Sequence, residues 1–211
     1  MDALIEYRDV RVDGDDGPIV AGFSAAAPAG RLTVMVGPSG AGKTTLLRLL
    51  NRLDDPDAGA VHFAGRDVRS YDVLDLRRRV QLVGQVPVTF PGSVAENLAV
   101  TGAPAAGDGA GPLLARVGLD PALAAREADR LSVGEAQRLA LARSLALDPE
   151  VLALDEPTSA LDTASKAGIV ALIRALADSG LTVVMVTHDP AHADLADHVV
   201  RVEPYSPDRR P

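Results

Sequence analysis

The sequence predicts an α/β fold with a mainly parallel central sheet. Short apolar runs rich in β-branched residues alternate with segments of helical periodicity, which is typical of a parallel sheet covered by helices on both faces. A glycine-rich loop that begins at Gly37 stands between one such run and the helix after it. Two strands joined by a turn-rich segment precede this unit and predict an N-terminal antiparallel β subdomain.

The glycine-rich loop fits the pattern G-x-x-x-x-G-K-[ST]. Arg31–Val36 before it is expected to be a buried strand, and Leu46–Leu50 after it a helix. In this context the loop N–H groups and the helix N-terminus favour phosphate binding, whereas an ordinary glycine-rich turn does not need the flanking elements. We expect Lys43 to reach the outer phosphates and the Thr44 hydroxyl to hold Mg²⁺. The loop reads Gly37-Pro38-Ser39-Gly40-Ala41-Gly42-Lys43-Thr44-Thr45.

Composition excludes several classes of protein. The chain has 211 residues, 47% of them hydrophobic, and no apolar run of about 18 residues or more, so a membrane-spanning helix is not expected. Residues 1–6 lack the basic region of a signal peptide, and the absence of cysteine excludes disulfides and thiolate metal sites. We expect a cytosolic protein. A net charge of −8 without a long basic run argues against nucleic acid as a partner.

The first half of the chain contains the antiparallel subdomain and the phosphate-loop unit. Strands are expected at Leu4–Val12 and Ile19–Ala27, joined by a segment rich in Asp, Gly and Pro. Other elements expected here are a strand at Ala60–Phe63, a helix at Leu74–Arg79 and a strand at Val80–Val83.

The middle of the chain lacks strand signals and is expected to form a small helical subdomain over about residues 94–135. Thr101–Pro112 is dominated by Gly, Ala and Pro and is expected to be a mobile loop. Short helices are expected at Val94–Leu98, Leu113–Val117 and Pro121–Ala128.

Regular alternation of strands and helices returns after Gly134. The helix expected at Ala164–Ala177 places four apolar side chains at i, i+3, i+4 and i+7, so one face belongs to the core. The polar, proline-rich tail of about 204–211 is expected to be disordered. Also expected are a helix at Glu135–Leu147 and strands at Val151–Leu154, Thr182–Val186 and His198–Val202.

Polar side chains that could bind Mg²⁺ or transfer a proton follow two of these strands. Asp155 and Glu156 end an apolar strand, where we expect Asp155 to support Mg²⁺ and Glu156 to act as general base towards water. Adjacent acids at a strand end also occur as solvated turn residues, but their place downstream of a phosphate loop favours the functional interpretation. His188 ends another strand, where its ring could contact the outer phosphate.

A second anion site is predicted at Leu131–Arg138. Ser132 and Gly134 immediately precede a helix, and a helix N-terminus with free N–H groups and a hydroxyl attracts anions. The alternative is that Ser132 is a simple N-cap of the helix. Taken alone, this stretch favours the N-cap over an anion site.

In their order along the chain, these motifs resemble those of the nucleotide-binding subunit of an ABC transporter, which is a P-loop NTPase. The resemblance covers about Leu4 to Glu203, so residues 1–211 are expected to form a single ABC ATPase domain. Gly37–Thr44 resembles Walker A, Gln85 the Q-loop, Leu131–Arg138 the LSGGQ signature, Val151–Glu156 Walker B, Ser159–Asp162 the D-loop and His188 the switch histidine.

The resemblance implies ATP and Mg²⁺ as cofactors and two subunits, for which we expect a homodimer, facing each other head to tail. Ser132 and Gly134 would grip the γ-phosphate of ATP held by the partner, and Asp162 would link the two sites. Gln85 would contact Mg²⁺ or the attacking water. Hydrolysis would drive a separate transmembrane permease from the cytoplasmic face of the membrane.

The chain departs from the family pattern at three places. Val133 replaces the second glycine of the signature, and Glu135 replaces its glutamine. Glu135 would bring negative charge near the partner's ATP unless it faces away. Asp13 or Gly14 stands where the family usually has an aromatic residue that stacks on adenine, so we expect the base to contribute little to binding.

Two other functions are considered. A soluble ABC-type ATPase acting on ribosomes or DNA usually has two cassettes or long coiled coils, which 211 residues do not accommodate. A small-molecule kinase would not need the signature or the Asp155-Glu156 pair. The direction of transport stays open, because Gln85–Val94 resembles exporters whereas Asn51–Leu53 and Val133 resemble phosphate-import subunits.

Overall fold

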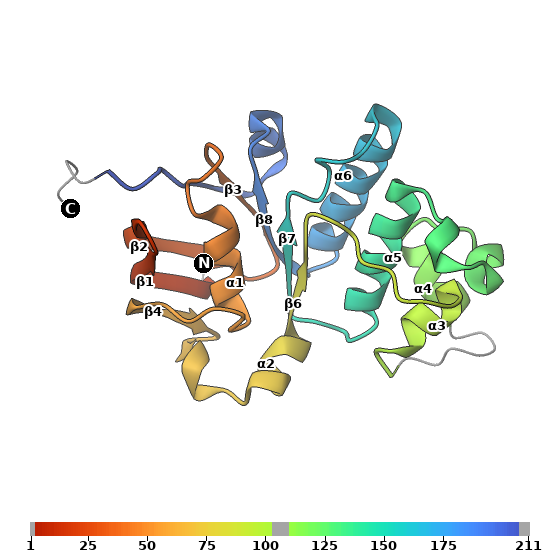
Figure 1. The fold of residues 1–211 in the computed structure, drawn as a ribbon, viewed down its shortest axis with the longest axis horizontal. Coiled ribbons are helices and arrows are strands. Elements are labelled where there is room, and N and C mark those ends of the chain that lie inside the picture. The colour runs from red at the N-terminus through yellow and green to blue at the C-terminus, as the bar shows by residue number, and fades with distance from the viewer. Residues whose placement is uncertain (1–2, 103–109, 207–211) are drawn as a thin grey trace.

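Two β-sheets organise the computed structural model, which describes residues 3–102 and 110–206. Within these residues one sheet has four strands in the order β2-β1-β4-β5, and the other has five in the order β6-β7-β8-β3-β9. Figure 1 shows the first sheet at one side, the second in the middle and the helical region at the far side. The predicted α/β fold with a parallel central sheet and an antiparallel β subdomain is confirmed.

The antiparallel sheet is built on a long hairpin whose strands meet at Gly14 and Gly17. Its last strand was not predicted, because a strand of two residues is too short to show a sequence pattern. The strands are β1 (Ala3–Gly14), β2 (Gly17–Pro28), β4 (Ala58–Phe63) and β5 (Arg66–Asp67).

The second sheet is parallel at every strand pair in the described residues. All residues of two interior strands, β7 and β8, are buried, which explains their mainly apolar sequences. The strands are β3 (Leu32–Val36), β6 (Val80–Val83), β7 (Val151–Asp155), β8 (Thr182–Thr187) and β9 (His198–Arg201).

Helices cover both faces of the parallel sheet. Val151 and Ala153 of β7 pack in one hydrophobic cluster with α1 (Lys43–Leu50) and the antiparallel sheet. Leu152 and Leu154 point to the opposite face and pack with α5 (Val133–Leu145) and α6 (Thr163–Asp178). The period of two along β7 therefore separates two cores, one for each face.

The helical region differs from the prediction in two places. Helix α4 (Ala110–Arg116) begins inside the predicted loop Thr101–Pro112, because Ala110 is buried and a proline is tolerated in the first turn of a helix. The helix predicted at Pro121–Ala128 is a 3₁₀ helix at Pro121–Ala125, followed by extended backbone at Arg126. The remaining helices are α2 (Val73–Arg79), α3 (Val94–Ala99) and 3₁₀ turns at Val68–Ser70, Ala128–Arg130 and Pro190–Leu195.

Two regions predicted to be mobile or disordered are only partly described. Residues 103–109 of the predicted loop and residues 207–211 of the predicted tail lie outside the described residues.

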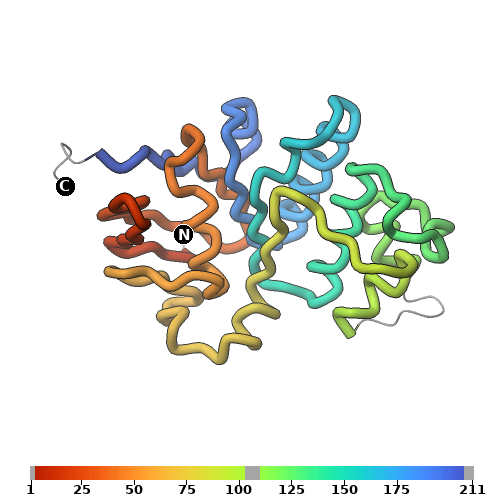
Figure 2. Tube along the Cα trace, in the orientation of Figure 1, coloured from red at the N-terminus to blue at the C-terminus, as the bar shows by residue number. Residues whose placement is uncertain are grey.

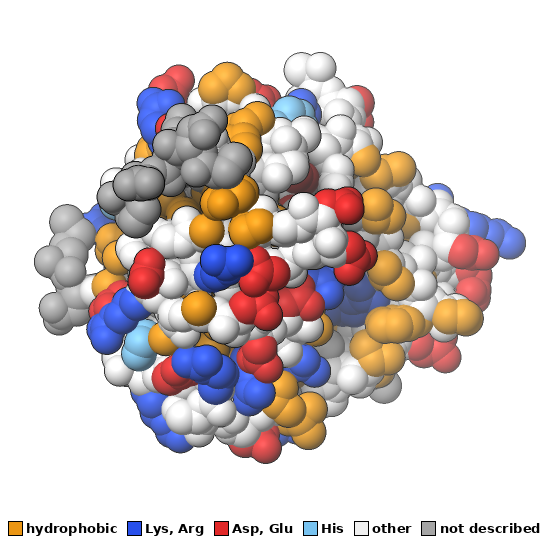
Figure 3. Space-filling model, turned by 60° about the vertical axis from the view of Figure 1, so that its left-hand side comes forward, with side chains coloured by type: hydrophobic (Ala, Val, Ile, Leu, Met, Phe, Trp, Pro, Cys, Tyr) orange, Lys and Arg blue, Asp and Glu red, His pale blue; other side chains and the backbone are white. Residues whose placement is uncertain are grey.

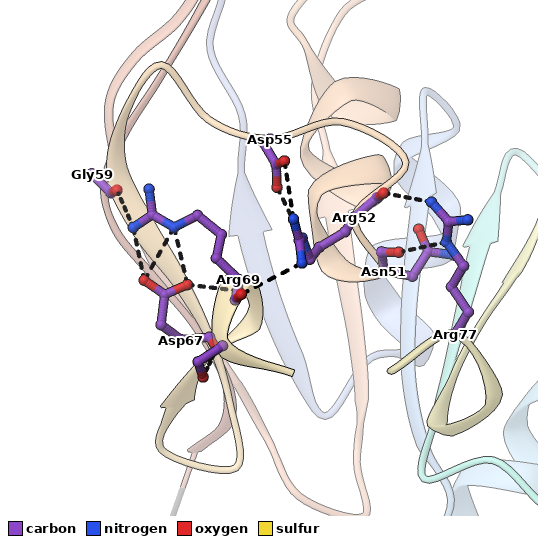
Figure 4. Close-up of polar contacts among 8 residues, drawn as sticks. Asn51, Arg52, Asp55, Gly59, Asp67, Arg69 and Arg77 are labelled. Atoms are coloured by element: carbon purple, nitrogen blue, oxygen red, sulfur yellow. Dashed lines mark hydrogen bonds and ion pairs between the residues drawn. The ribbon is translucent and has the colours of Figure 1, made fainter. Parts of the chain in front are cut away.

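A polar network fixes the end of α1, the helix that follows the phosphate loop (Figure 4). Arg77 donates hydrogen bonds to the carbonyl oxygens of Asn51 at 3.1 Å and Arg52 at 2.7 Å. Arg52 in turn donates to the carbonyl oxygen of Arg69 at 3.5 Å, and Arg69 pairs with Asp67 at 2.7 Å. The network thus ties the helix end to α2 and to the antiparallel sheet, because its donors satisfy carbonyls that the helix leaves unpaired.

We expect Arg77→Ala to lower the free energy of unfolding by about 1–3 kcal/mol, because a half-buried charged donor to two backbone carbonyls is lost. Urea denaturation measures the change. Arg78→Ala is the matched control, since Arg78 is exposed on the same helix. Equal stability of the two variants would contradict a stabilising role for Arg77.

Candidate functional site

The phosphate loop is held open by its own lysine and by glycines. The buried Lys43 donates from Nζ to the carbonyl oxygens of Gly37 at 2.8 Å and Pro38 at 2.9 Å. Gly42 caps α1 with φ +86°, and a Cβ there would lie 2.5 Å from Val20. Only glycine fits at this position, where the loop passes against β2.

One cavity gathers most of the residues predicted for the site. It is bounded by the phosphate loop, by Gln85 and by the carboxyl ends of β7 and β8. Ile19 of β2 also lines it and was not predicted, because an exposed isoleucine in a strand carries no sequence signal. The lining residues are Ile19, Ser39, Gly40, Gly42, Lys43, Thr44, Thr45, Gln85, Glu156 and His188.

Thr44 and Asp155 form a pair of oxygen donors beside this cavity. The Thr44 hydroxyl donates to Asp155 Oδ1 at 3.1 Å across 111 residues of sequence. Burial raises the pKa of the Asp155 carboxyl, although the Thr44 hydroxyl lowers it in part. A buried carboxylate beside a hydroxyl fits Mg²⁺, which takes one or two protein oxygens together with phosphate and water. Among the described residues no cluster of three or more His, Asp or Glu side chains suits a metal ion.

Glu156 and His188 are in direct contact. The Nδ1 atom of His188 lies 2.9 Å from Oε2 of Glu156, whose side chain is only 13% exposed. Glu156 has φ +47°, a left-handed conformation that is costly for a residue with a side chain. Its backbone N–H donates to the carbonyl oxygen of Val186 at 3.1 Å, which holds this conformation at the edge of the sheet.

Gln85 is joined to the backbone of Glu156, the residue after β7, through one serine. Gln85 Nε2 donates to the Ser159 hydroxyl at 3.2 Å, and that hydroxyl donates to the carbonyl oxygen of Glu156 at 3.0 Å. Ser159 belongs to the D-loop motif but was not assigned a separate role. The motif itself was the signal that could have identified it.

Asp162 caps helix α6. Its Oδ1 accepts from the N–H groups of Ala164 and Ser165 at 3.0 Å, and its Oδ2 from the Ser165 hydroxyl at 2.6 Å. The Ser165 hydroxyl is the main reason why the pKa of Asp162 is lowered. A Cβ on Gly134 would lie 3.0 Å from the same hydroxyl, so the starts of α5 and α6 pack closely.

Ser132 and Glu135 form a capping box at the start of α5. The Ser132 hydroxyl accepts from the Glu135 N–H at 3.3 Å, and the Glu135 carboxylate accepts from the Ser132 N–H at 2.8 Å. This backbone hydrogen bond lowers the pKa of Glu135. Glu135 is therefore turned back onto Ser132, as the sequence pattern S-x-x-E could have indicated. Ser132, Gly134 and Asp162 do not line the cavity of the phosphate loop.

The parallel sheet, the phosphate loop on α1 and the acidic pair after β7 define a P-loop nucleotide-binding domain. A family model described as "ABC transporter" matches residues 20–159. The chain belongs to the ABC transporter family and carries its ATP-binding, ATP-hydrolysing domain.

Known relatives have the same domain within longer proteins. The chain is 49% identical over 175 residues to Protein STAR1 of Oryza sativa subsp. japonica, covering 81% of this chain and 51% of that protein. It is 42% identical over 206 residues to Fe(3+) ions import ATP-binding protein FbpC 1 of Rhodococcus jostii (strain RHA1), covering 90% and 58%. The chain thus spans about half the length of these curated relatives.

A solved structure matches the whole fold. The dimeric ATP-binding cassette MJ0796, in a post-hydrolysis state bound to ADP and Pi, has a TM-score of 0.82 at 26% identity. The match covers 96% of this chain and 97% of that one. No helix within the described residues has the length and apolarity required to cross a lipid bilayer.

Proposed function

We propose that the chain is the ATP-hydrolysing subunit that powers transport of a substrate through a separate membrane permease. It acts at the cytoplasmic face of the membrane, residues 1–211 form a single ABC ATPase domain with a helical insertion at about 94–135, and two copies sandwich two ATP molecules. The observation that supports a dimer is that Ser132 and Gly134 lie outside the cavity of the phosphate loop. An anion site that lies outside its own chain's nucleotide cavity can face the nucleotide of a partner.

In this proposal the loop from Gly37 to Thr45 wraps the phosphates, and Lys43 contacts the outer ones. Thr44 and Asp155 would hold Mg²⁺, with Gln85 next to it or to the attacking water. Bound Mg²⁺ neutralises negative charge on the phosphates. The contact between Thr44 and Asp155 at 3.1 Å supports this set of donors.

Glu156 is the proposed general base. It accepts a proton from water as the water oxygen bonds to the γ-phosphorus and ADP leaves. His188 orients the Glu156 carboxylate through their 2.9 Å contact and lines the cavity towards the outer phosphate. The left-handed backbone of Glu156 supports this role, because such strain is retained mainly where function requires it.

An apolar groove directly after Gln85 is the proposed docking site for the permease. Val86 and Val88 are 73% and 60% exposed and line the groove with Phe90. The guanidinium of Arg143 on α5 lies 4.9 Å from the centre of the Phe90 ring and donates to the carbonyl oxygen of Val88. An apolar segment of a membrane protein fits this groove, and Gln85 reaches from its edge into the nucleotide cavity.

Glu156→Gln should keep ATP binding and lower the rate of hydrolysis by about 100-fold or more, since the general base is lost while the shape of the side chain is kept. Phosphate release and ATP titration measure the two effects. Glu150→Gln, an acid just before the same strand, is the control and should hydrolyse ATP normally. Normal turnover by Glu156→Gln would remove it from the mechanism.

The dimer is tested by Ser132→Arg combined with Glu156→Gln. ATP should convert the Glu156→Gln protein from monomer to dimer on a sizing column, and adding Ser132→Arg should abolish the dimer because the long cation blocks the γ-phosphate contact. ATP affinity of the monomer should change by less than about 0.5 kcal/mol, the scale of a surface substitution.

The matched control for this experiment is Ser93→Arg. Ser93 forms an equivalent capping box with Glu96 at the start of α3, so its loss costs a cap without touching the signature. A dimer that survives Ser132→Arg, or a monomer that no longer binds ATP, contradicts the assignment of Ser132 to a partner's nucleotide. Where the natural partner is a different cassette chain, both chains are used.

Val88→Glu tests the groove. We expect a multi-span membrane protein to be encoded beside this chain, and the two should co-purify after joint expression. Val88→Glu should abolish co-purification, because it places a charge in the apolar groove. ATP hydrolysis by the isolated subunit should persist. Leu74→Glu is the control, since Leu74 is 62% exposed on α2 outside the groove. Normal co-purification of Val88→Glu would rule out the groove as the docking site.

A further inference from the structure

A second groove continues the nucleotide cavity away from Lys43. Its lining includes Gly14, Ile19, Gly40 and Tyr205. Ile19 and Gly40 also line the cavity of the phosphate loop, so the two hollows are adjacent and share a wall. A ligand whose phosphates lie in the loop can therefore extend along this wall to Tyr205.

The backbone shortly before Tyr205 is anchored against the start of the phosphate loop. The N–H of the buried Val202 donates to the carbonyl oxygen of Val36 at 2.8 Å, at the entrance to the loop. A Cβ on Gly37 would lie 2.1 Å from the Val202 carbonyl oxygen, so the two backbones are in direct contact. Tyr205 follows three residues later, and Figure 2 shows this last segment running from the parallel sheet towards the N-terminal hairpin.

The two ends of the continuous groove differ in charge. Lys43 and the start of α1 provide positive charge at one end. The hairpin residues Asp15 and Asp16 line the other end and repel phosphate. This side of the molecule faces forward in Figure 3, where hydrophobic side chains lie between charged groups of both signs. The Asp15 end therefore suits an uncharged part of a ligand.

Tyr205 presents an aromatic surface at that end. The residue is 43% exposed, and Ile19, which lines both hollows, is 36% exposed, so both have apolar surface to bury. Gly14, at the end of β1, contributes no side chain to the groove. A Cβ on Gly14 would lie only 3.1 Å from the Ile19 side chain, so a larger residue at this position would displace Ile19.

We propose that Tyr205 is the stacking platform for the purine base of the bound nucleotide, with Ile19 forming the adjacent apolar wall. Asp13 and Gly14 at the end of β1 led to the expectation that the base contributes little to binding. The proposal replaces that expectation, because an aromatic ring comes from the segment after β9. Adenine and guanine both present a flat face to the ring, so stacking raises affinity for ATP and GTP alike. This inference depends on nucleotide binding at the phosphate loop and not on the permease.

The test compares the affinity for a nucleotide with the affinity for a triphosphate that lacks the base and sugar. Calorimetry measures affinity for AMP-PNP, a non-hydrolysable ATP analogue, and for inorganic triphosphate, both with Mg²⁺. Base stacking on an aromatic ring contributes about 1–3 kcal/mol, or about 5- to 150-fold in affinity. Tyr205→Ala should lose that factor for AMP-PNP and keep its affinity for triphosphate. Tyr205→Phe should bind AMP-PNP within about twofold of the unchanged protein.

Leu195→Ala, which removes an exposed apolar side chain outside the groove, is the control and should bind both ligands normally. AMP-PNP affinity unchanged in Tyr205→Ala would overturn the proposal, as would an equal loss for AMP-PNP and triphosphate. Loss of AMP-PNP affinity in Tyr205→Phe, which keeps the aromatic ring, would also overturn the proposal. If the unchanged protein binds neither ligand, the assignment of the phosphate loop as a nucleotide site is wrong. This result differs from a failure of the stacking proposal alone.

Discussion

The parallel pairing of β7, β8 and β3 is the constraint on which the nucleotide site depends. Asp155 pairs in register with Val186, and Val36 with Thr187, so the three strands end side by side. The residues that follow them are then brought to one edge of the sheet from points far apart in the sequence. The contacts of Thr44 with Asp155 and of His188 with Glu156 follow from this register.

The sequence alone predicts the elements in which every side chain is buried. Strands buried on both faces contain uninterrupted apolar runs, such as Val151–Leu154 and Val183–Val186, because each of these side chains enters one core or the other. The phosphate loop is equally predictable, since its glycines are required by backbone geometry. Gly42 with φ +86° is an example.

Features fixed by tertiary contacts were not predictable. Strand β5 exists through pairing with β4, and α4 begins at Ala110 because that residue is buried against its neighbours. The left-handed backbone at Glu156 was not predictable, because glutamate does not favour that conformation and no glycine marks the position. The capping box of Ser132 and Glu135 is different, because its pattern was visible, and reading it would have shown which way Glu135 turns.

Helix α5 gives the proposed function a simple mechanical basis. Its first turn carries Gly134 after the Ser132 cap, and its last turn carries Arg143, which binds the segment that lines the apolar groove. At 1.5 Å per residue the helix is about 20 Å long and behaves as one rigid element.

In the proposed dimer, a partner bound in the groove would therefore contact the same helix whose other end would face the second nucleotide. The groove segment also reaches the cavity of the phosphate loop, because Gln85 donates to the Ser159 hydroxyl and this hydroxyl donates to the carbonyl oxygen of Glu156. Phe90, at the far end of this segment, is held by Asn97 at 2.8 and 2.9 Å. In the proposed dimer, a permease bound in the groove would therefore be linked through Gln85 to one ATP site and through α5 to the other.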